Sequence, residues 1–184
     1  MFGIILLHSF SSTPKEFDNL IIYLKDQGFY TLAPLLPRHG TIPEELASVN
    51  YKEWLFAAEK AFKDLNSYCQ GVYVIGQTLG AVLALNIVSN QLRILGIITL
   101  SGYIRLSRWQ KLIKPIFPFL PHMIPFATEE SRLITQFLDQ WTQNKTYRDV
   151  PKRSFLEVYN LLSKTNRLLK KIEQQFTYFI LRKL

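Results

Sequence analysis

Residues 76 to 80, Gly-Gln-Thr-Leu-Gly, hold the clearest candidate for chemistry in the sequence. They follow an apolar run that begins at Val72 and precede small and apolar residues that reach Asn90, as expected of a strand, a sharp corner and a helix. A corner of this kind brings one side chain to the carboxyl end of a parallel sheet in a strained backbone conformation, and the flanking glycines leave room for strand and helix to meet. We therefore predict that Thr78 presents its hydroxyl there.

Short apolar runs supply the strands that would position this corner. Gly3–Leu7 and Ile94–Leu100 have the length and composition of strands buried on both faces of a parallel sheet, and residues 29–36 are predicted as a further strand. Strands and helical patterns alternate along the first hundred residues. The sequence therefore predicts a parallel sheet with helices on both faces and any site at the carboxyl ends of the strands.

Two of the predicted helices have recognisable N-terminal signals. Thr13, Pro14 and Glu16 combine an N-cap, a proline in the first turn and the acid of a capping box, and Gly28 ends that helix. Asn50 is the expected cap of a second helix. The apolar residues of this second helix share one face, and they are Tyr51, Trp54, Leu55, Ala58, Phe62 and Leu65.

The pattern changes after Ser101. Residues 112–127 contain four prolines among large apolar side chains, which predicts a lid segment. Two amphipathic stretches follow, the second after Pro151, and residues 176–181 form a strand-like apolar run. We expect a core at residues 1–102, a helical cap or lid at 103–165, and a final helix and core strand of the same domain at 166–184.

Composition limits the class of protein. The 184 residues are 48% hydrophobic and 20% charged, which fits one globular domain. The net charge of +8 arises in residues 101–184, with 15 Lys/Arg against 6 Asp/Glu, since residues 1–100 hold 7 against 8. A basic surface can meet nucleic acid, anionic lipid or solvent alone. The helical spacing of these residues, without an RNA-binding signature, favours solvated helix faces and no nucleic-acid partner.

Cysteine content and the first residues indicate a compartment. Cys69 is the single cysteine, so no internal disulfide can form, and a buried side chain in a reducing compartment is expected. The apolar run at residues 4–7 is too short for a signal peptide or a membrane span. We therefore expect a cytoplasmic chain without a transmembrane segment.

With these pieces in order, the sequence resembles the α/β-hydrolase superfamily, and within it the carboxylesterase and monoacylglycerol-lipase branch. The resemblance covers residues 3–102, whereas residues 103–165 fit a helical cap only loosely. The motifs that carry it are His8-Ser9-Phe10, where that branch tends to have His-Gly-Phe; Pro34 with Pro37-Arg38-His39-Gly40; Pro43-Glu44-Glu45-Leu46; Trp54; and Gly76-Gln77-Thr78-Leu79-Gly80 in place of Gly-Leu-Ser-Leu-Gly. It implies an α/β-hydrolase fold with a helical cap inserted after the strand ending near Leu100, lacking the family's last strand and helix.

The resemblance also implies roles for particular residues. Thr78 takes the place of the nucleophile, and the backbone N–H groups of Phe10 and Leu79 would form an oxyanion hole. Ser9 stands where glycine is usual, and a side chain there restricts the loop if the family geometry needs a positive φ. The expected acyl-binding residues, for which core packing beneath the cap is the alternative, are Ile116, Phe119, Met123 and Phe126. No metal ion or cofactor is expected.

The acid and base of a catalytic triad have no matching position. In this family an Asp follows the strand after the cap and a His follows the next strand; residues 176–181 resemble the first of these strands, and only Arg182, Lys183 and Leu184 come after them. His8 and His39 occupy positions that support loop geometry, and His122 lies in the lid as polar surface. Without a base, a triad enzyme loses several orders of magnitude in rate.

Three interpretations stay open. The chain is an esterase for acyl esters of small alcohols or glycerol, a catalytically silent member of the fold that binds an apolar ligand or a partner, or a shortened product of a hydrolase gene. Thr78 is either a weak nucleophile or the mark of an impaired site, because a β-branched residue resists the left-handed conformation of such a corner. The hydrophobic strand at residues 176–181 also predicts a second copy of the chain or a partner that covers it.

Overall fold

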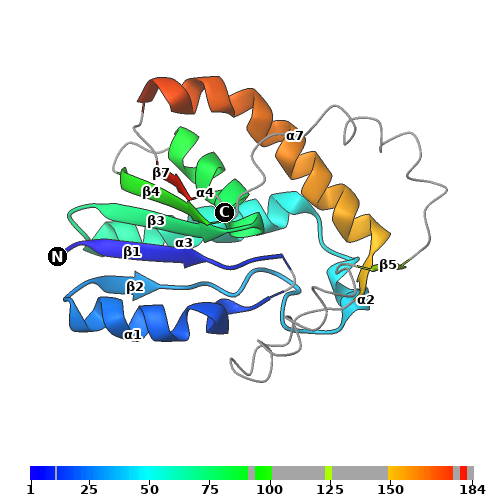
Figure 1. Ribbon diagram of the computed structural model, residues 1–184, viewed down its shortest axis with the longest axis horizontal. Helices are drawn as coiled ribbons and strands as arrows, with labels where there is room; N and C mark the ends of the chain where they lie inside the picture. Colours follow the sequence, from blue (N-terminus) through cyan, green and yellow to red (C-terminus); the bar gives the residue numbers. More distant parts are fainter. Residues whose placement is uncertain (11, 91–93, 101–122, 126–148, 176–178, 182–184) are drawn as a thin grey trace.

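A parallel sheet of five strands forms the centre of the described structure (Figure 1). The structure is a computed structural model that describes residues 1–10, 12–90, 94–100, 123–125, 149–175 and 179–181. The sheet order is β2-β1-β3-β4-β7, and neighbouring strands are parallel. The strands are β1 (Gly3–Leu7), β2 (Tyr30–Leu32), β3 (Val72–Gln77), β4 (Ile94–Leu100) and β7 (Phe179–Leu181). The register aligns Leu7 with Gly76 and Gly76 with Thr99, so the carboxyl ends of β1, β3 and β4 share one edge.

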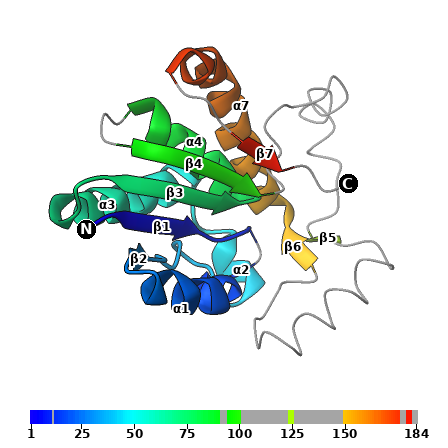
Figure 2. The same ribbon diagram turned by 60° about the vertical axis from the view of Figure 1, so that its left-hand side comes forward.

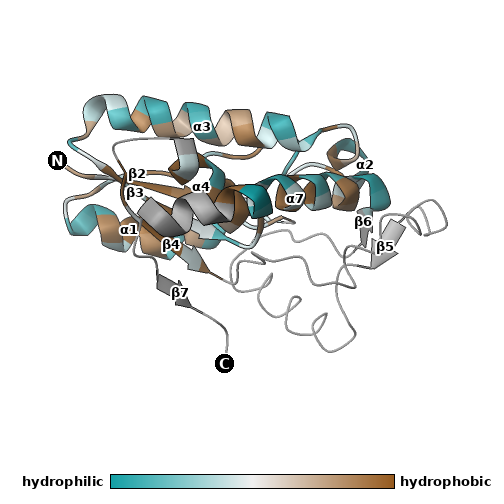
Figure 3. Ribbon diagram, turned by 90° about the horizontal axis from the view of Figure 1, so that it is seen from above, coloured by the Kyte–Doolittle hydropathy of each residue, from teal (hydrophilic) through white to brown (hydrophobic). Residues whose placement is uncertain are grey.

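Helices cover both faces of this sheet. One face packs against the 3-10 turn η1 (Pro14–Phe17) and α1 (Asp18–Asp26), with Ile4, Leu6, Phe17 and Ile75 in the core between them. The other face packs against α3 (Tyr51–Tyr68) and α4 (Leu79–Asn90). Because side chains alternate along a strand, β1 and β3 each contribute side chains to the cores on both faces of the sheet. Figure 3 shows the hydrophobic strands enclosed between α3 and α1.

A long helix, α7 (Lys152–Gln175), packs on the outer side of α4 (Figures 1 and 2). The side-chain amide of Asn86 on α4 donates a hydrogen bond to the Thr165 hydroxyl at 2.6 Å, and both side chains are buried. The Glu157 carboxylate accepts a hydrogen bond from the backbone N–H of Tyr51, at the start of α3, at 3.0 Å. These contacts join α7 to both core helices on that face.

The remaining described elements are short. α2 (Pro43–Leu46) follows β2, and β5 (Met123–Pro125) pairs antiparallel with β6 (Asp149–Pro151). The helix α7 runs without a break through residue 165, where the expected cap ends. Most of residues 101–148 lies outside the described part, so the division at residues 102 and 165 stays a prediction. Within the described ranges, no helix combines the length and apolar content needed to cross a lipid bilayer.

Two local expectations from the sequence are wrong. The strand predicted at residues 29–36 is only three residues long, because Pro34 has no N–H for the ladder and the N–H of Leu36 is donated to the His8 ring instead. The capping box predicted at Thr13 and Glu16 is absent, because the Thr13 side chain makes no capping hydrogen bond and the Glu16 carboxylate turns to Ser9. The capping box at Asn50, with Glu53 as its acid, is present.

Candidate active site

Thr78 lies at the corner between β3 and α4, as the sequence predicts. Its φ of 49° is in the left-handed region, which non-glycine residues rarely occupy. The backbone N–H of Thr78 donates a hydrogen bond to the Leu100 carbonyl at the end of β4, at 3.0 Å. The side chain is half-buried. The corner therefore holds a half-buried threonine at the carboxyl edge of the sheet, in a fixed and strained backbone conformation.

The two glycines of the motif allow three backbone segments to meet. A Cβ atom added at Gly76 would overlap the Gly80 carbonyl group, and one added at Gly80 would overlap the Leu7 carbonyl and lie 2.9 Å from the His8 carbonyl oxygen. Backbone atoms cannot move aside as a flexible side chain can. The first turn of α4 therefore sits directly against the end of β1, and this confirms the role expected for the glycines.

The two candidate oxyanion donors come from these adjoining segments. Leu79 is the first residue of α4, so its N–H has no carbonyl one turn earlier in the helix to bind. Phe10 follows β1 by three residues, in the loop that begins at His8. β1 and β3 are neighbours in the sheet. This proximity supports the pairing, and the oxyanion hole itself stays a prediction.

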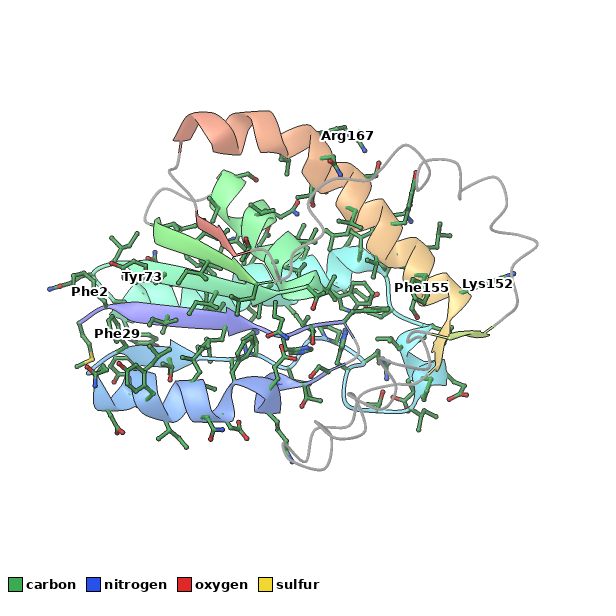
Figure 4. The ribbon with its side chains drawn as sticks, viewed as in Figure 1. Phe2, Phe29, Tyr73, Lys152, Phe155 and Arg167 are labelled. Carbon is green, nitrogen blue, oxygen red and sulfur yellow. The ribbon has the colours of Figure 1, made fainter. Side chains whose placement is uncertain are left out.

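Phe10 is fixed by an aromatic cluster. Its ring is buried and lies edge-on to three others, with centroid distances of 5.9 Å to Trp54, 5.8 Å to Phe155 and 6.2 Å to His39. Trp54 is in turn held by a hydrogen bond from its indole N–H to the Pro37 carbonyl at 3.1 Å. Phe155 belongs to α7 and is labelled in Figure 4. Edge-to-face packing of this kind restrains the Phe10 ring.

Ser9 is held by the carboxylate of Glu16. Its backbone N–H donates to Glu16 Oε1 at 2.8 Å and its hydroxyl donates to Glu16 Oε2 at 2.6 Å. Among non-glycine residues described, positive φ values occur at Arg38 and Thr78, so Ser9 needs no left-handed conformation. Partial burial raises the pKa of Glu16, and hydrogen bonds from Ser9 and Ser12 partly offset that rise. The serine in place of glycine is accommodated without backbone strain.

His8 joins two loops and is fully buried. The backbone N–H of Leu36 donates to its Nε2 at 3.0 Å, so the proton of the neutral ring is on Nδ1, which donates to the Ser9 carbonyl at 2.9 Å. Burial lowers the pKa of His8 to about 4, against the smaller effect of the Ser9 carbonyl. Both ring nitrogens are engaged and the ring is neutral near pH 7, so His8 supports loop geometry.

His39 has a similar environment. Its Nδ1 donates to the Pro37 carbonyl at 3.2 Å, and its ring lies 4.9 Å from that of His8 and 5.6 Å from that of Trp54. Burial, reinforced by the proximity of His8, lowers the pKa of His39 to about 3. A buried neutral ring of this kind stabilises the loop after β2, and its low pKa makes it a poor general base near neutral pH.

The expected acyl-binding residues are only partly covered by the structure. Ile116, Phe119 and Phe126 lie outside the described residues, as does His122. The backbone of Met123 begins β5. Their assignment to an acyl site stays a prediction. In the part of the chain that is described, no group of three or more His, Cys, Asp or Glu side chains is arranged to hold a metal ion.

Two residues near the candidate site were not singled out from the sequence for this role. Glu16 was assigned to a helix cap, and Phe155 to an amphipathic helix without a specific contact. An acid seven residues after a serine that replaces glycine is a signal that could have indicated the first contact. The contact between Phe155 and Phe10 depends on how α7 packs, and spacing along the chain gives no sign of it.

Comparison with solved structures identifies the class of fold. A metagenome-derived lipolytic enzyme superposes with a TM-score of 0.75 at 18% identity, over 93% of this chain and 68% of the enzyme. A monoglyceride lipase from Saccharomyces cerevisiae, solved with a substrate analogue, superposes with a TM-score of 0.67 at 16% identity, over 97% of this chain and 66% of the lipase. The chain has the α/β-hydrolase fold, as the sequence motifs predict.

Sequence comparison points to the same branch of that fold. A thermostable monoacylglycerol lipase from Bacillus sp. (strain H-257) is 27% identical over 100 residues, which are 54% of this chain and 40% of the lipase. No protein-family model matches the chain. The similarity therefore lies with monoacylglycerol-lipase-like α/β-hydrolases, and the matched segment spans less than half of that relative.

Proposed function

We propose that this chain is a carboxylic-ester hydrolase of the carboxylesterase or monoacylglycerol-lipase-like type, with low activity carried by the Thr78 hydroxyl. The supporting observation is the left-handed conformation of Thr78 between β3 and α4, with Gly80 seated against the end of β1. This is the geometry of a nucleophile elbow, in which the hydroxyl and the helix N-terminus face one small space. The proposed ligand is a small apolar ester or acyl compound, and the lipolytic relatives support that class.

In the proposed reaction, Thr78 Oγ1 forms a bond to the carbonyl carbon of the ester. The threonine proton passes through solvent to the departing alcohol, and a water molecule then releases the acid from the acyl-enzyme. The N–H groups of Leu79 and Phe10 are proposed to stabilise the negative oxygen of the tetrahedral intermediate. No cofactor enters this scheme.

Two features of the site account for a low rate. The hydroxyl of Thr78 has no described histidine to take its proton, since His8 uses both ring nitrogens in loop contacts and burial lowers the pKa of His39 to about 3. The β-branched side chain is also strained at this φ, by about 1 to 3 kcal/mol, and its methyl group crowds the approach of an ester.

A fluorophosphonate probe tests the proposal. Wild-type protein, Thr78→Ser and Thr78→Ala are incubated with the probe, and the adduct is located by mass spectrometry. We expect slow labelling at residue 78 in the wild type, labelling at least about tenfold faster in Thr78→Ser, and none there in Thr78→Ala. Folded protein that remains unlabelled in both the wild type and Thr78→Ser would overturn the proposal.

A second candidate is a non-catalytic binding protein with the same fold. This candidate is favoured by the hydrogen bonds that hold His8 and His39 in the loops, because neither of these two described histidines is then available as a base for Thr78. Calorimetric titration with a fatty acid distinguishes the two candidates when it is paired with an ester-turnover assay. Tight binding without turnover or probe labelling supports this second function, and labelling at Thr78 supports the first.

A further inference from the structure

The described helices differ in how their charges are distributed. α3 carries equal numbers of basic and acidic residues, namely Lys52, Lys60 and Lys63 against Glu53, Glu59 and Asp64. α7 instead carries six basic residues and two acidic ones, namely Lys152, Arg153, Lys164, Arg167, Lys170 and Lys171 against Glu157 and Glu173. A substantial part of the positive charge of the second half of the sequence is therefore concentrated on one helix.

Arg153, Lys164 and Arg167 lie on the side of α7 that faces away from the core. Ser154, Leu161 and Thr165 are fully buried on the core side. Arg153 and Arg167 are exposed, and Lys164 is partly exposed. Arg153 and Lys164 are about three turns apart and Arg167 follows Lys164 by about one turn, so all three lie on one face. Figure 4 shows the side chains of Lys152 and Arg167 projecting away from the sheet.

Fewer acidic than basic side chains are described on this face, where Glu157 lies one turn after Arg153. The Glu157 carboxylate is engaged with the backbone N–H of Tyr51 at 3.0 Å. Across the described residues, neither Arg153 nor Lys164 forms an ion pair, and the guanidinium of Arg167 contacts only the Ser163 carbonyl of its own helix. The charges of Arg153, Lys164 and Arg167 are therefore available to a partner.

We propose that the basic ridge of α7, formed by Arg153, Lys164 and Arg167, docks on the surface of an anionic lipid bilayer. From Arg153 to Arg167 the ridge is about 21 Å long, so a flat anionic surface can contact all three side chains at once. Each cation near such a surface strengthens binding about fivefold. The choice of lipid over other polyanions rests on the proposed function, because apolar acyl esters accumulate in membranes.

Co-sedimentation with sucrose-loaded vesicles tests the proposal without any turnover. The full chain is mixed with vesicles of phosphatidylcholine alone, or with about 30% phosphatidylglycerol, at low and at high salt. The test variant is Arg153→Gln/Lys164→Gln/Arg167→Gln. Its matched control is Lys52→Gln/Lys60→Gln/Lys63→Gln on α3, which removes the same charge from a helix of mixed sign. Circular dichroism confirms that both variants fold.

We expect binding to the anionic vesicles that salt weakens, a loss of about 100-fold in the α7 variant and little change in the α3 variant. Absent binding, equal binding to phosphatidylcholine alone, or equal losses in both variants would overturn the proposal. Tighter binding to a single-stranded or duplex oligonucleotide than to anionic vesicles would also overturn it. Because no outcome depends on Thr78, vesicle binding without probe labelling would uphold the ridge while the proposed function fails.

Discussion

The carboxylate of Glu16 holds Ser9 at two points, since it accepts one hydrogen bond from the backbone N–H at 2.8 Å and another from the hydroxyl at 2.6 Å. The Ser9 carbonyl is held from the other side by the His8 ring at 2.9 Å. The backbone of Ser9, the residue before Phe10, is therefore restrained on its N–H side by Glu16 and on its carbonyl side by His8. A glycine at this position would lack one of these hydrogen bonds.

Removal of either partner of this pair is expected to weaken the fold in a coupled way. Ser9→Ala and Glu16→Ala should each lower the free energy of unfolding by about 1 to 2 kcal/mol, because each breaks a hydrogen bond to a carboxylate. The double variant should cost less than the sum by about 1 kcal/mol, which urea unfolding of all four proteins measures. Lys15→Ala, at the exposed neighbouring residue, is the control. Strict additivity would contradict a direct Ser9–Glu16 interaction.

Stability is expected to fall steeply on mild acidification. His8 and His39 have folded-state pKa values near 4 and 3, below the usual 6.5. At a pH between each folded-state pKa and 6.5, the unfolded chain therefore binds more protons than the folded protein does. Their contribution is complete above pH 6.5 and is lost as the pH falls toward the folded pKa. From pH 7 to pH 5 the loss should be about 2 kcal/mol for each ring. Urea unfolding at both pH values measures it, and a histidine resonance of either ring titrating near pH 6.5 would refute it.

Replacement of Thr78 by glycine is expected to stabilise the protein. Glycine adopts a φ of 49° without the penalty that a β-branched residue pays, so the free energy of unfolding should rise by about 1 kcal/mol in spite of the greater freedom of the unfolded chain. Thermal and urea unfolding of wild type and Thr78→Gly give the difference. Arg38→Gly, at the other positive φ among described non-glycine residues, is a matched comparison. A clear loss of stability in Thr78→Gly would show that the corner is not strained by its side chain.

Two glycines with different surroundings should respond differently to alanine. Gly80→Ala forces a Cβ into the backbone of Leu7 and should cost more than about 3 kcal/mol or prevent folding. Gly28 has a φ of 82° but nothing within 4 Å of an added Cβ, so Gly28→Ala should cost only about 1 to 2 kcal/mol of conformational strain. Expression and urea unfolding of both variants separate steric overlap from strain. Equal costs would contradict the close contact between α4 and β1.

Continuous apolar runs made much of the sheet predictable. β1, β3 and β4 are apolar strands with few polar interruptions, and the glycines at 76 and 80 indicated the corner directly. β1 is buried along its whole length, as predicted. The prediction that β4 is buried on both faces is wrong, because Leu95 and Ile98 are exposed. Less predictable were features that depend on competition for one hydrogen-bonding group. The N–H of Leu36 donates to His8, so β2 is shorter than predicted. The carboxylate of Glu16 accepts from Ser9, so it does not complete the capping box predicted with Thr13. Spacing along the chain does not decide such competitions, because the competing partners come from different segments.

The corner between β3 and α4 depends on the absence of side chains at Gly76 and Gly80 and on the hydrogen bond from the backbone N–H of Thr78 to the Leu100 carbonyl. The side chain of Thr78 contributes to neither. The backbone of the corner and the side chain at residue 78 can therefore change independently of each other. Exchange of the threonine for serine or cysteine would leave this backbone intact, so protein engineers could use the corner to present interchangeable reactive groups.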